Sequence, residues 1–192
     1  MGGRRSGLAR AAALLVAGVV AWALTLREAP TRGPETASVR ILYTPSPEAL
    51  HADIETLGQA KRTIDLAAYV LTDRAMMQAL IGAAKRGVAV RIYIDRAFTT
   101  RGPNKNGEEF ADLLATPGIT VRYKAREAGM MHLKSYRVDD RILRTGSANF
   151  SYSGGRFQDN DVVIIDSPAH AAQFGAVFEK MWARADNEEH RR

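Results

Sequence analysis

Apolar and polar residues follow two different periods along residues 39–182, and the two periods alternate. Strand-like runs lie at 39–43, 63–69, 88–95, 119–123 and 161–165. Apolar residues spaced three and four apart predict helices over 47–60, 73–86, 108–115 and 168–182, with Ser46, Thr72 and Ser167 as the N-caps of three of them. Residues 150–160 read as irregular. Because helices and strands alternate, we predict an α/β fold with a mixed sheet.

A strand pair around the turn Asp139-Asp140 carries the candidate chemistry. His132 and Lys134 are two residues apart, so an extended strand projects both from one face and turns Leu133 into the core. Gly146 lets the returning strand bend, after which Ser147 and Asn149 again share a face. An imidazole, an ammonium, a hydroxyl and an amide would then converge. Such a set suits an anionic tetrahedral group such as a phosphate.

The spacing H-x-K-x4-D-x6-G-S-x-N resembles the signature of the phospholipase D superfamily. It is most similar to the branch with one motif per chain, which includes small bacterial endonucleases and mitochondrial cardiolipin hydrolase-like proteins. The layout extends the resemblance over Ser38 to Ala185. The resemblance implies an α-β-α sandwich and a phosphodiesterase that needs no metal.

The resemblance also implies roles for single residues. His132 would attack phosphorus to form a phosphohistidine, while Lys134 and Asn149 hold the non-bridging oxygens and Ser147 adds a hydrogen bond. Asp139 belongs to the motif, where it would brace the local structure. Relatives place a glutamate before an asparagine and the next strand, to orient the nucleophile. That position here is Asp159, with Asp161 as the neighbouring candidate.

A second histidine is the usual acid for the leaving oxygen in this superfamily. The sequence has no internal repeat, and His51, His170 and His190 lack the rest of the motif. We expect all three to be structural or to face solvent. The resemblance therefore implies a symmetric homodimer, in which His132 of each copy meets the other across a two-fold axis.

Composition limits the chemistry further. The chain of 192 residues has no cysteine, no H-E-x-x-H motif and no cluster of carboxylates, so we expect neither a metal nor a cofactor. The net charge is +6. A local basic excess lies between Gly118 and Gly146, formed by Arg122, Lys124, Arg126, Lys134, Arg137, Arg141 and Arg144. It predicts a positive field that attracts phosphate polyanions, unless it is an ordinary solvated surface.

The N-terminus has a different composition from the rest. A basic leader precedes the uncharged run Ala11 to Leu26, which has the plan of a signal peptide or, if uncleaved, of a membrane anchor; a buried helix is the third alternative. We therefore divide the chain into a leader or anchor at 1–26, a linker at 27–37, a catalytic domain at 38–185 and a charged tail at 186–192. Either leading alternative implies an exported or membrane-anchored protein.

The sequence leaves three functions open. The first is a sequence-nonspecific endonuclease on DNA or RNA, which the basic excess favours. The second is a phospholipase D-type hydrolase of phospholipids, which uses the same chemistry on another phosphodiester. The third is a non-catalytic module that binds nucleic acid or membrane and keeps only the fold.

Overall fold

A computed structural model describes residues 36–96 and 107–190 of the chain. The predicted leader or anchor, most of the linker and most of the polar loop at 99–107 lie outside the described residues. None of the helices in the described ranges has the length and apolar character needed to span a bilayer.

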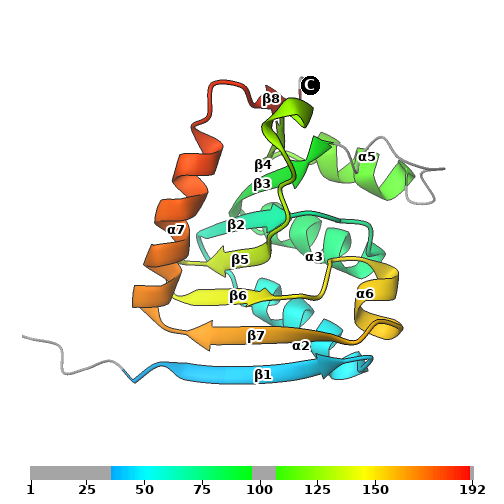
Figure 1. Cartoon of the computed structure of the whole chain (residues 1–192), viewed down its shortest axis with the longest axis vertical. Coiled ribbons are helices and arrows are strands. Elements are labelled where there is room, and N and C mark those ends of the chain that lie inside the picture. Colours follow the sequence, from blue (N-terminus) through cyan, green and yellow to red (C-terminus); the bar gives the residue numbers. More distant parts are fainter. Residues whose placement is uncertain (1–35, 97–106, 191–192) are drawn as a thin grey trace, which may run out of the picture. The chain divides into compact units, whose positions relative to one another are not determined.

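A single mixed sheet forms the centre of the fold (Figure 1). Its strands are β1 (Ser38–Thr44), β2 (Thr63–Ala68), β3 (Ala89–Asp95), β4 (Ile119–Lys124), β5 (Lys134–Val138), β6 (Ile142–Gly146), β7 (Asn160–Asp166) and β8 (Glu188–Glu189). Their order is β1-β7-β6-β5-β2-β3-β4-β8. Strands β2, β3 and β4 run parallel, and the other pairs are antiparallel. The predicted mixed sheet is confirmed.

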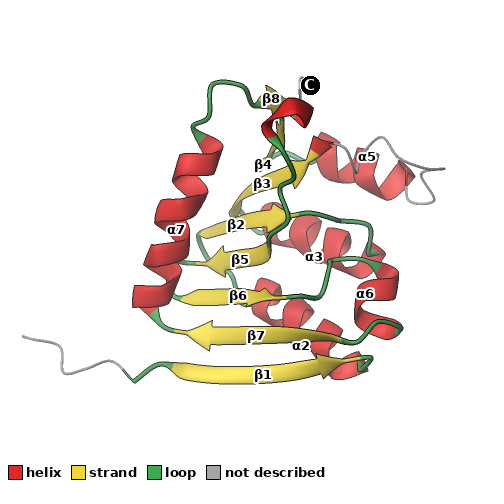
Figure 2. Ribbon diagram, viewed as in Figure 1, coloured by secondary structure: helices red, strands yellow, loops and turns green. Residues whose placement is uncertain are grey.

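Helices cover both faces of this sheet (Figure 2). They are α2 (Pro47–Gly58), α3 (Arg74–Lys85), α5 (Gly107–Ala115), α6 (Tyr152–Arg156) and α7 (Pro168–Trp182), with a 3-10 turn, η1, at Arg126–Ala128. Successive residues of a strand face opposite sides. Leu66 of β2 accordingly packs in the cluster with α2 and α3, whereas Ala67 packs with Phe174 and Phe178 of α7. The predicted α-β-α sandwich is confirmed.

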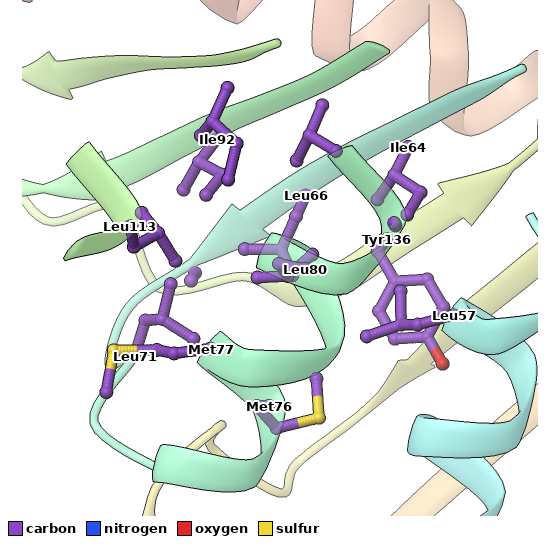
Figure 3. Packing of buried hydrophobic residues seen from close by; sticks show 14 of the residues in the cluster. Leu57, Ile64, Leu66, Leu71, Met76, Met77, Leu80, Ile92, Leu113 and Tyr136 are labelled. Atoms are coloured by element: carbon purple, nitrogen blue, oxygen red, sulfur yellow. The ribbon is translucent and has the colours of Figure 1, made fainter. Parts of the chain in front are cut away.

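The larger core lies between the sheet and helices α2, α3 and α5 (Figure 3). Met76, Met77 and Leu80 of α3 are fully buried against Ile64 and Leu66 of β2. The methionine pair thus packs in the core, as its helical spacing predicts.

One predicted helix start is wrong. Ser46 caps α2 as predicted, but α3 is capped by Asp73 rather than Thr72, because the Asp73 carboxylate accepts hydrogen bonds from the first-turn N–H groups. The backbone N–H of Thr72 instead donates to the carbonyl oxygen of Phe150 at 2.8 Å. This long-range contact, which no local pattern reveals, keeps Thr72 in the preceding loop.

Two segments expected to lack regular structure contain short elements. The stretch at 150–160 includes α6, and the charged tail includes β8, which pairs with β4. The Tyr93 hydroxyl also donates to Oδ1 of Asn187 at 2.9 Å. The fold therefore continues beyond the predicted boundary at Ala185. The spacing of the apolar residues over 168–182 predicts Val177 on the buried face of α7, but Val177 is exposed.

Candidate active site

Strand register brings the pieces of the motif to one end of the sheet. Tyr136 of β5 pairs with Arg144 of β6, and Gly146 of β6 pairs with Val162 of β7. The start of β5, the end of β6 and the start of β7 therefore share one rim, on the right in Figure 1. Because Gly146 has a φ of 135° and an added Cβ would lie 2.4 Å from the carbonyl oxygen of Asp161, glycine is required where β6 ends on this rim.

His132 and Lys134 meet on one aromatic ring, that of Tyr69, at the end of β2. The imidazole and phenol ring centroids are 4.7 Å apart, and Nζ of Lys134 lies 4.9 Å from the same phenol centroid. The Lys134 ammonium also donates to the carbonyl oxygen of His132 at 2.6 Å. The structure thus brings together the two residues that the H-x-K spacing places on one face.

Exposure differs sharply between the neighbours in this segment. His132 is exposed, whereas Lys134 is only 5% exposed, and burial lowers the pKa of its ammonium. Leu133 is 38% exposed, so its predicted place in the core is wrong. The reason is that β5 starts only at Lys134, so Leu133 lies in the segment before the strand.

Tyr69 was missed as a site residue because the sequence presents it as an ordinary strand aromatic. Its backbone N–H donates to the carbonyl oxygen of Leu133 at 2.8 Å, which fixes the end of β2 to the motif segment. Its ring then supports His132 and Lys134 together. Its position at the end of a predicted buried strand is the one feature of the sequence that could have indicated a role for Tyr69 in the site.

Ser147 is paired with Asp161 rather than with Asp159. The Ser147 hydroxyl donates to Oδ1 of Asp161 and accepts from the Asp161 backbone N–H at 2.9 Å. The hydrogen bond from this hydroxyl is the main reason why the pKa of Asp161 is lowered; partial burial opposes it, and the backbone N–H of Ser147 adds to it. Asp159 is exposed in the segment before β7. In the described part of the chain, neither carboxylate is hydrogen-bonded to the His132 imidazole, so the orienting contact predicted for Asp159 is absent.

Asn149 follows the end of β6 and is partly buried. Its Oδ1 atom is buried and has no hydrogen-bond partner among the described residues. A cavity of about 20 Å³ adjoins the side chain and is also lined by Asp73, Arg144 and Arg156. A buried acceptor without a partner is costly, so Oδ1 is suited to accept a hydrogen bond from a bound donor, whereas an anionic oxygen would have to be held by the Nδ2 group of Asn149.

Arg144 holds the two halves of the site together. This residue is 1% exposed, and its Nη1 donates to the carbonyl oxygens of Lys134 at 2.7 Å and Ala148 at 3.2 Å. Its Nε and Nη2 form a two-point ion pair with Asp53 at 3.0 and 3.1 Å. In the sequence, Arg144 stands out only as one of several basic residues between Gly118 and Gly146. Its partner lies 91 positions away, which local patterns cannot reveal.

Asp139 lies at the opposite end of β5 from His132. Its carboxylate accepts hydrogen bonds from the backbone N–H groups of Lys61, Arg62 and Thr63 at 2.7 to 2.9 Å. Burial alone would raise the pKa of Asp139, but these hydrogen bonds outweigh it and lower the pKa. Asp139 therefore anchors the start of β2 and is not among the residues that the rim brings together.

The predicted basic surface is largely neutralised within the fold. Four of its arginines form ion pairs with acidic residues distant in sequence: Arg122 with Glu189, Arg137 with Asp65, Arg141 with Asp166 and Arg144 with Asp53. Lys124 donates to the carbonyl oxygen of Met130 at 3.3 Å. Among the described residues, Lys134 is the member of this group that lies in the candidate site without a carboxylate partner.

The other histidines are separate from this rim. His51 is exposed on α2, and His170 is exposed on α7, where its Nδ1 lies 3.0 Å from the Ser167 hydroxyl. His190 is exposed after β8. Within the described ranges, His, Asp and Glu do not gather in groups of three or more that could hold a metal ion.

The fold and this rim together define a phospholipase D-like protein, and comparison with known families supports the same class. A family model described as "Cardiolipin synthase, PLD-like domain" matches residues 54–182, which include the whole motif. The chain therefore belongs to the phospholipase D-like family.

Individual relatives lie in the same family. The chain is 29% identical over 133 residues to a mitochondrial cardiolipin hydrolase of Danio rerio, which covers 69% of this chain and 56% of that protein. Among solved structures, the phospholipase D family member Nuc from Salmonella typhimurium is 28% identical, with a TM-score of 0.69 over 82% of this chain and 100% of Nuc. NucT from Helicobacter pylori is 21% identical, with a TM-score of 0.71 over 81% of this chain and 100% of NucT. The chain thus spans somewhat more than half the length of the cardiolipin hydrolase it matches.

Proposed function

We propose that this chain is a phosphodiesterase that works through a phosphohistidine at His132. The observation that carries the proposal is the meeting of His132 and Lys134 on the Tyr69 ring, at the rim where β6 delivers Ser147 and Asn149. An exposed imidazole can reach a phosphodiester. A buried ammonium next to it stabilises the charge that builds on the non-bridging oxygens more strongly than one in water would.

The proposed reaction proceeds in two displacements. A ring nitrogen of His132 attacks phosphorus, a phosphorus–nitrogen bond forms, and the bond to one ester oxygen breaks as that oxygen takes a proton from a general acid. Water then attacks phosphorus and gives its proton to the same group, now a base, and His132 is released. Lys134 and the Nδ2 group of Asn149 hold the phosphoryl oxygens, and Ser147 adds a hydrogen bond when its hydroxyl proton turns from Asp161 to the substrate.

The general acid in this proposal is His132 of a second copy. The sheet surface next to the site supports a homodimer. Strand β1 carries three exposed apolar side chains, those of Val39, Ile41 and Tyr43. They lie on the face of the sheet that α7 covers over other strands, whereas Leu42 packs toward α2 on the opposite face. Tyr43 pairs with Asp161, so this apolar surface begins beside the Ser147–Asp161 pair. A second copy would cover it and bring its own His132 to the site.

Nucleic acid is the first proposed substrate. The exposed His132 on an open rim suits a polymeric phosphodiester. The net charge favours a polyanion only weakly, because it falls from +6 to +3 without Arg4, Arg5 and Arg10 of the leader. The arginine ion pairs described above weaken the part of this argument that rested on a local basic field. We therefore propose that the site recognises the phosphodiester itself. This predicts cleavage within the strand and without sequence preference.

Phospholipid is the second candidate, and two observations favour it. The relative from Danio rerio bears the name of a cardiolipin hydrolase. In this chain, Met130 and Leu133 flank His132 and are exposed, as would suit a site that approaches a lipid surface.

One experiment tests the chemistry and separates the substrates. Purified protein is incubated with EDTA and either supercoiled plasmid or phospholipid vesicles that include cardiolipin. We expect nicked plasmid, complete loss of nicking in His132→Asn, and a covalent phosphoryl adduct on His132 by rapid-quench mass spectrometry. Release of phosphatidate with intact plasmid would transfer the proposal to lipid. Binding of either substrate with no turnover and no adduct would leave only a binding module.

We also propose that residues 1–26 direct export or hold the protein at a membrane. The support is the uncharged run after a basic leader, and it is independent of the catalytic argument. The intact mass of protein recovered from membrane and periplasmic fractions tests it. Recovery of the full-length chain in the cytosol alone would reject both forms.

A further inference from the structure

Helix α6 presents two exposed aromatic rings beside the candidate site. Tyr152 is 59% exposed and Phe157 is 69% exposed, and their ring centroids lie 5.7 Å apart at an angle of 56°. Neither residue belongs to the motif or to a hydrophobic core. We refer to Tyr152, Arg156 and Phe157 together as the α6 platform.

The α6 platform is anchored from below by an arginine. The guanidinium of Arg156 lies 4.3 Å from the Tyr152 ring centroid, and its Nη1 donates to Oδ2 of Asp73 at 2.6 Å. Asp73 is also the N-cap of α3. The carboxylate, guanidinium and phenol thus form a layered stack that begins in the core and ends at the surface, which restrains Tyr152.

The backbone of α6 is fixed against the residues of the site. The Ser151 hydroxyl accepts a hydrogen bond from Gly154 N at 3.1 Å, and the Gly154 carbonyl oxygen accepts from Thr44 Oγ1 at 3.2 Å. A Cβ added to Gly154 would lie 2.5 Å from the carbonyl oxygen of Asn149, so the helix packs directly on the motif. Figure 2 shows α6 on the side of the sheet where β6 ends. The backbone of α6 is therefore fixed next to Asn149, Arg156 restrains the Tyr152 ring, and the Phe157 ring contacts the Tyr152 ring.

From this arrangement we infer that the α6 platform stacks an unpaired nucleobase next to the phosphodiester that reacts at His132. Aromatic rings that are both exposed and restrained suit base stacking, because the ring faces are available and little side-chain entropy is lost on binding. The inference rests on the proposed nuclease function. It adds that the substrate is single-stranded at the site, because a base within a duplex has no free face.

The surroundings of the rings favour a base over a membrane. Exposed Gln158 and Asp159 follow Phe157 directly, and Arg156 lies between the rings in sequence. Inserting the rings into lipid would also remove the Asp159 carboxylate from water, which is costly. A base needs only the ring faces and leaves that carboxylate solvated.

The test compares two oligomers of equal length with the full-length protein: an oligothymidylate and an oligomer of abasic deoxyribose phosphates. Loss of one stacked base lowers affinity by roughly tenfold, so we expect kcat/KM to be about tenfold higher on the oligothymidylate, mainly through KM. The double variant Tyr152→Ala/Phe157→Ala is expected to bring the ratio between the two oligomers close to one. Tyr152→Phe and Phe157→Trp keep aromatic faces and are expected to preserve the ratio.

Gln158→Ala is the matched control, since it changes the adjacent exposed side chain and is expected to keep the wild-type ratio. An unchanged ratio in the double variant would overturn the inference. The inference would also be overturned if the double variant kept the ratio but lost binding to cardiolipin vesicles or changed its oligomeric state. If the wild-type protein cleaves neither oligomer, the proposed function fails separately, and binding of fluorescent oligothymidylate to the same variants then decides whether the α6 platform holds a base.

Discussion

At the residue scale, Lys134 combines a position in the protein interior with the charge that the proposed chemistry needs. Burial lowers the pKa of its ammonium below the ordinary value of 10.5, because the charged form is poorly solvated there. The ammonium has the His132 carbonyl oxygen and the Tyr69 ring as partners rather than a carboxylate. Its charge is thus left available for a phosphate, at some cost to the folded state.

The lowered pKa predicts how activity and stability depend on pH. Activity should fall on the alkaline side at a pH below 10.5, as Lys134 loses its proton. The folded state prefers the neutral amine more than the unfolded state does, so Lys134 destabilises the folded state most at low and neutral pH. This effect disappears as pH rises through the range between the lowered pKa of Lys134 in the folded state and its ordinary pKa. Lys134→Met should therefore abolish activity without lowering Tm at pH 7. A clear fall in Tm would contradict this account.

Arg144 predicts a second effect at this scale. Arg144→Met leaves the buried Asp53 carboxylate without its ion-pair partner, so we expect a loss of about 3–5 kcal/mol in the free energy of unfolding. Arg141→Met is the control, because its ion pair with Asp166 is largely exposed, and it should change stability by less than about 1 kcal/mol. Adding Asp53→Asn to Arg144→Met should recover part of the loss. Urea denaturation measures all three, and equal losses at positions 144 and 141 would contradict the assignment.

At the element scale, the hairpin of β5 and β6 sets the spacing of the motif. Asp139 and Asp140 adopt positive φ values of 52° and 56°, which makes the tight turn that the two aspartates predict. The turn fixes the pairing of Tyr136 with Arg144, and this register carries the end of β6 to the start of β5. A shift of one residue would turn Ser147 and Asn149 to other faces.

Gly146 offers the test of this geometry. Gly146→Ala forces a side chain into a backbone conformation with a φ of 135° and against the carbonyl oxygen of Asp161, so we expect a loss of more than about 1 kcal/mol and of activity. Gly58→Ala is the control: it lies at the end of α2 with nothing within 4 Å of the added Cβ, and should be neutral or stabilising by about 0.5–1 kcal/mol. Thermal unfolding and plasmid nicking measure both. Full activity in Gly146→Ala would show that activity does not depend on the close approach of the end of β6 to Asp161.

At the scale of the whole molecule, one face of the sheet is unevenly covered. Helix α7 packs over β2, β5 and β6, whereas the same face of β1 carries exposed apolar side chains. This exposed row reaches the candidate site at Tyr43, which pairs with Asp161, and the proposed homodimer would cover it.

The homodimer is tested on this face. Ile41→Glu places a charge at the centre of the exposed apolar row, so we expect a dimer of the wild-type protein to dissociate and nicking to fall in parallel. Arg40→Glu is the control, because Arg40 is exposed on the opposite face of the same strand. Size-exclusion chromatography with light scattering gives the oligomeric state. An active monomer would contradict a site shared between two copies.

The sequence by itself determined most of the elements and the composition of the candidate site. Hydrophobic periodicity predicted strands β1 to β4 and β7 and the long helices, because the period reflects which face of each element is buried. Strands β5 and β6 were predicted from the strand pair around the turn Asp139-Asp140. The motif spacing located His132, Lys134, Ser147 and Asn149, since a strand, a two-residue turn and a returning strand have fixed geometry.

Only the tertiary structure decided which charges are available and which carboxylate pairs with Ser147. Arg144 pairs with Asp53, Arg137 with Asp65 and Ser147 with Asp161, and the arginine pairs neutralise part of the predicted basic surface within the fold. Leu133, Tyr69 and β8 depend equally on neighbours from distant segments. The physical reason is that local periodicity specifies a face, whereas the partner on that face is set by strand order and helix packing across the whole sheet.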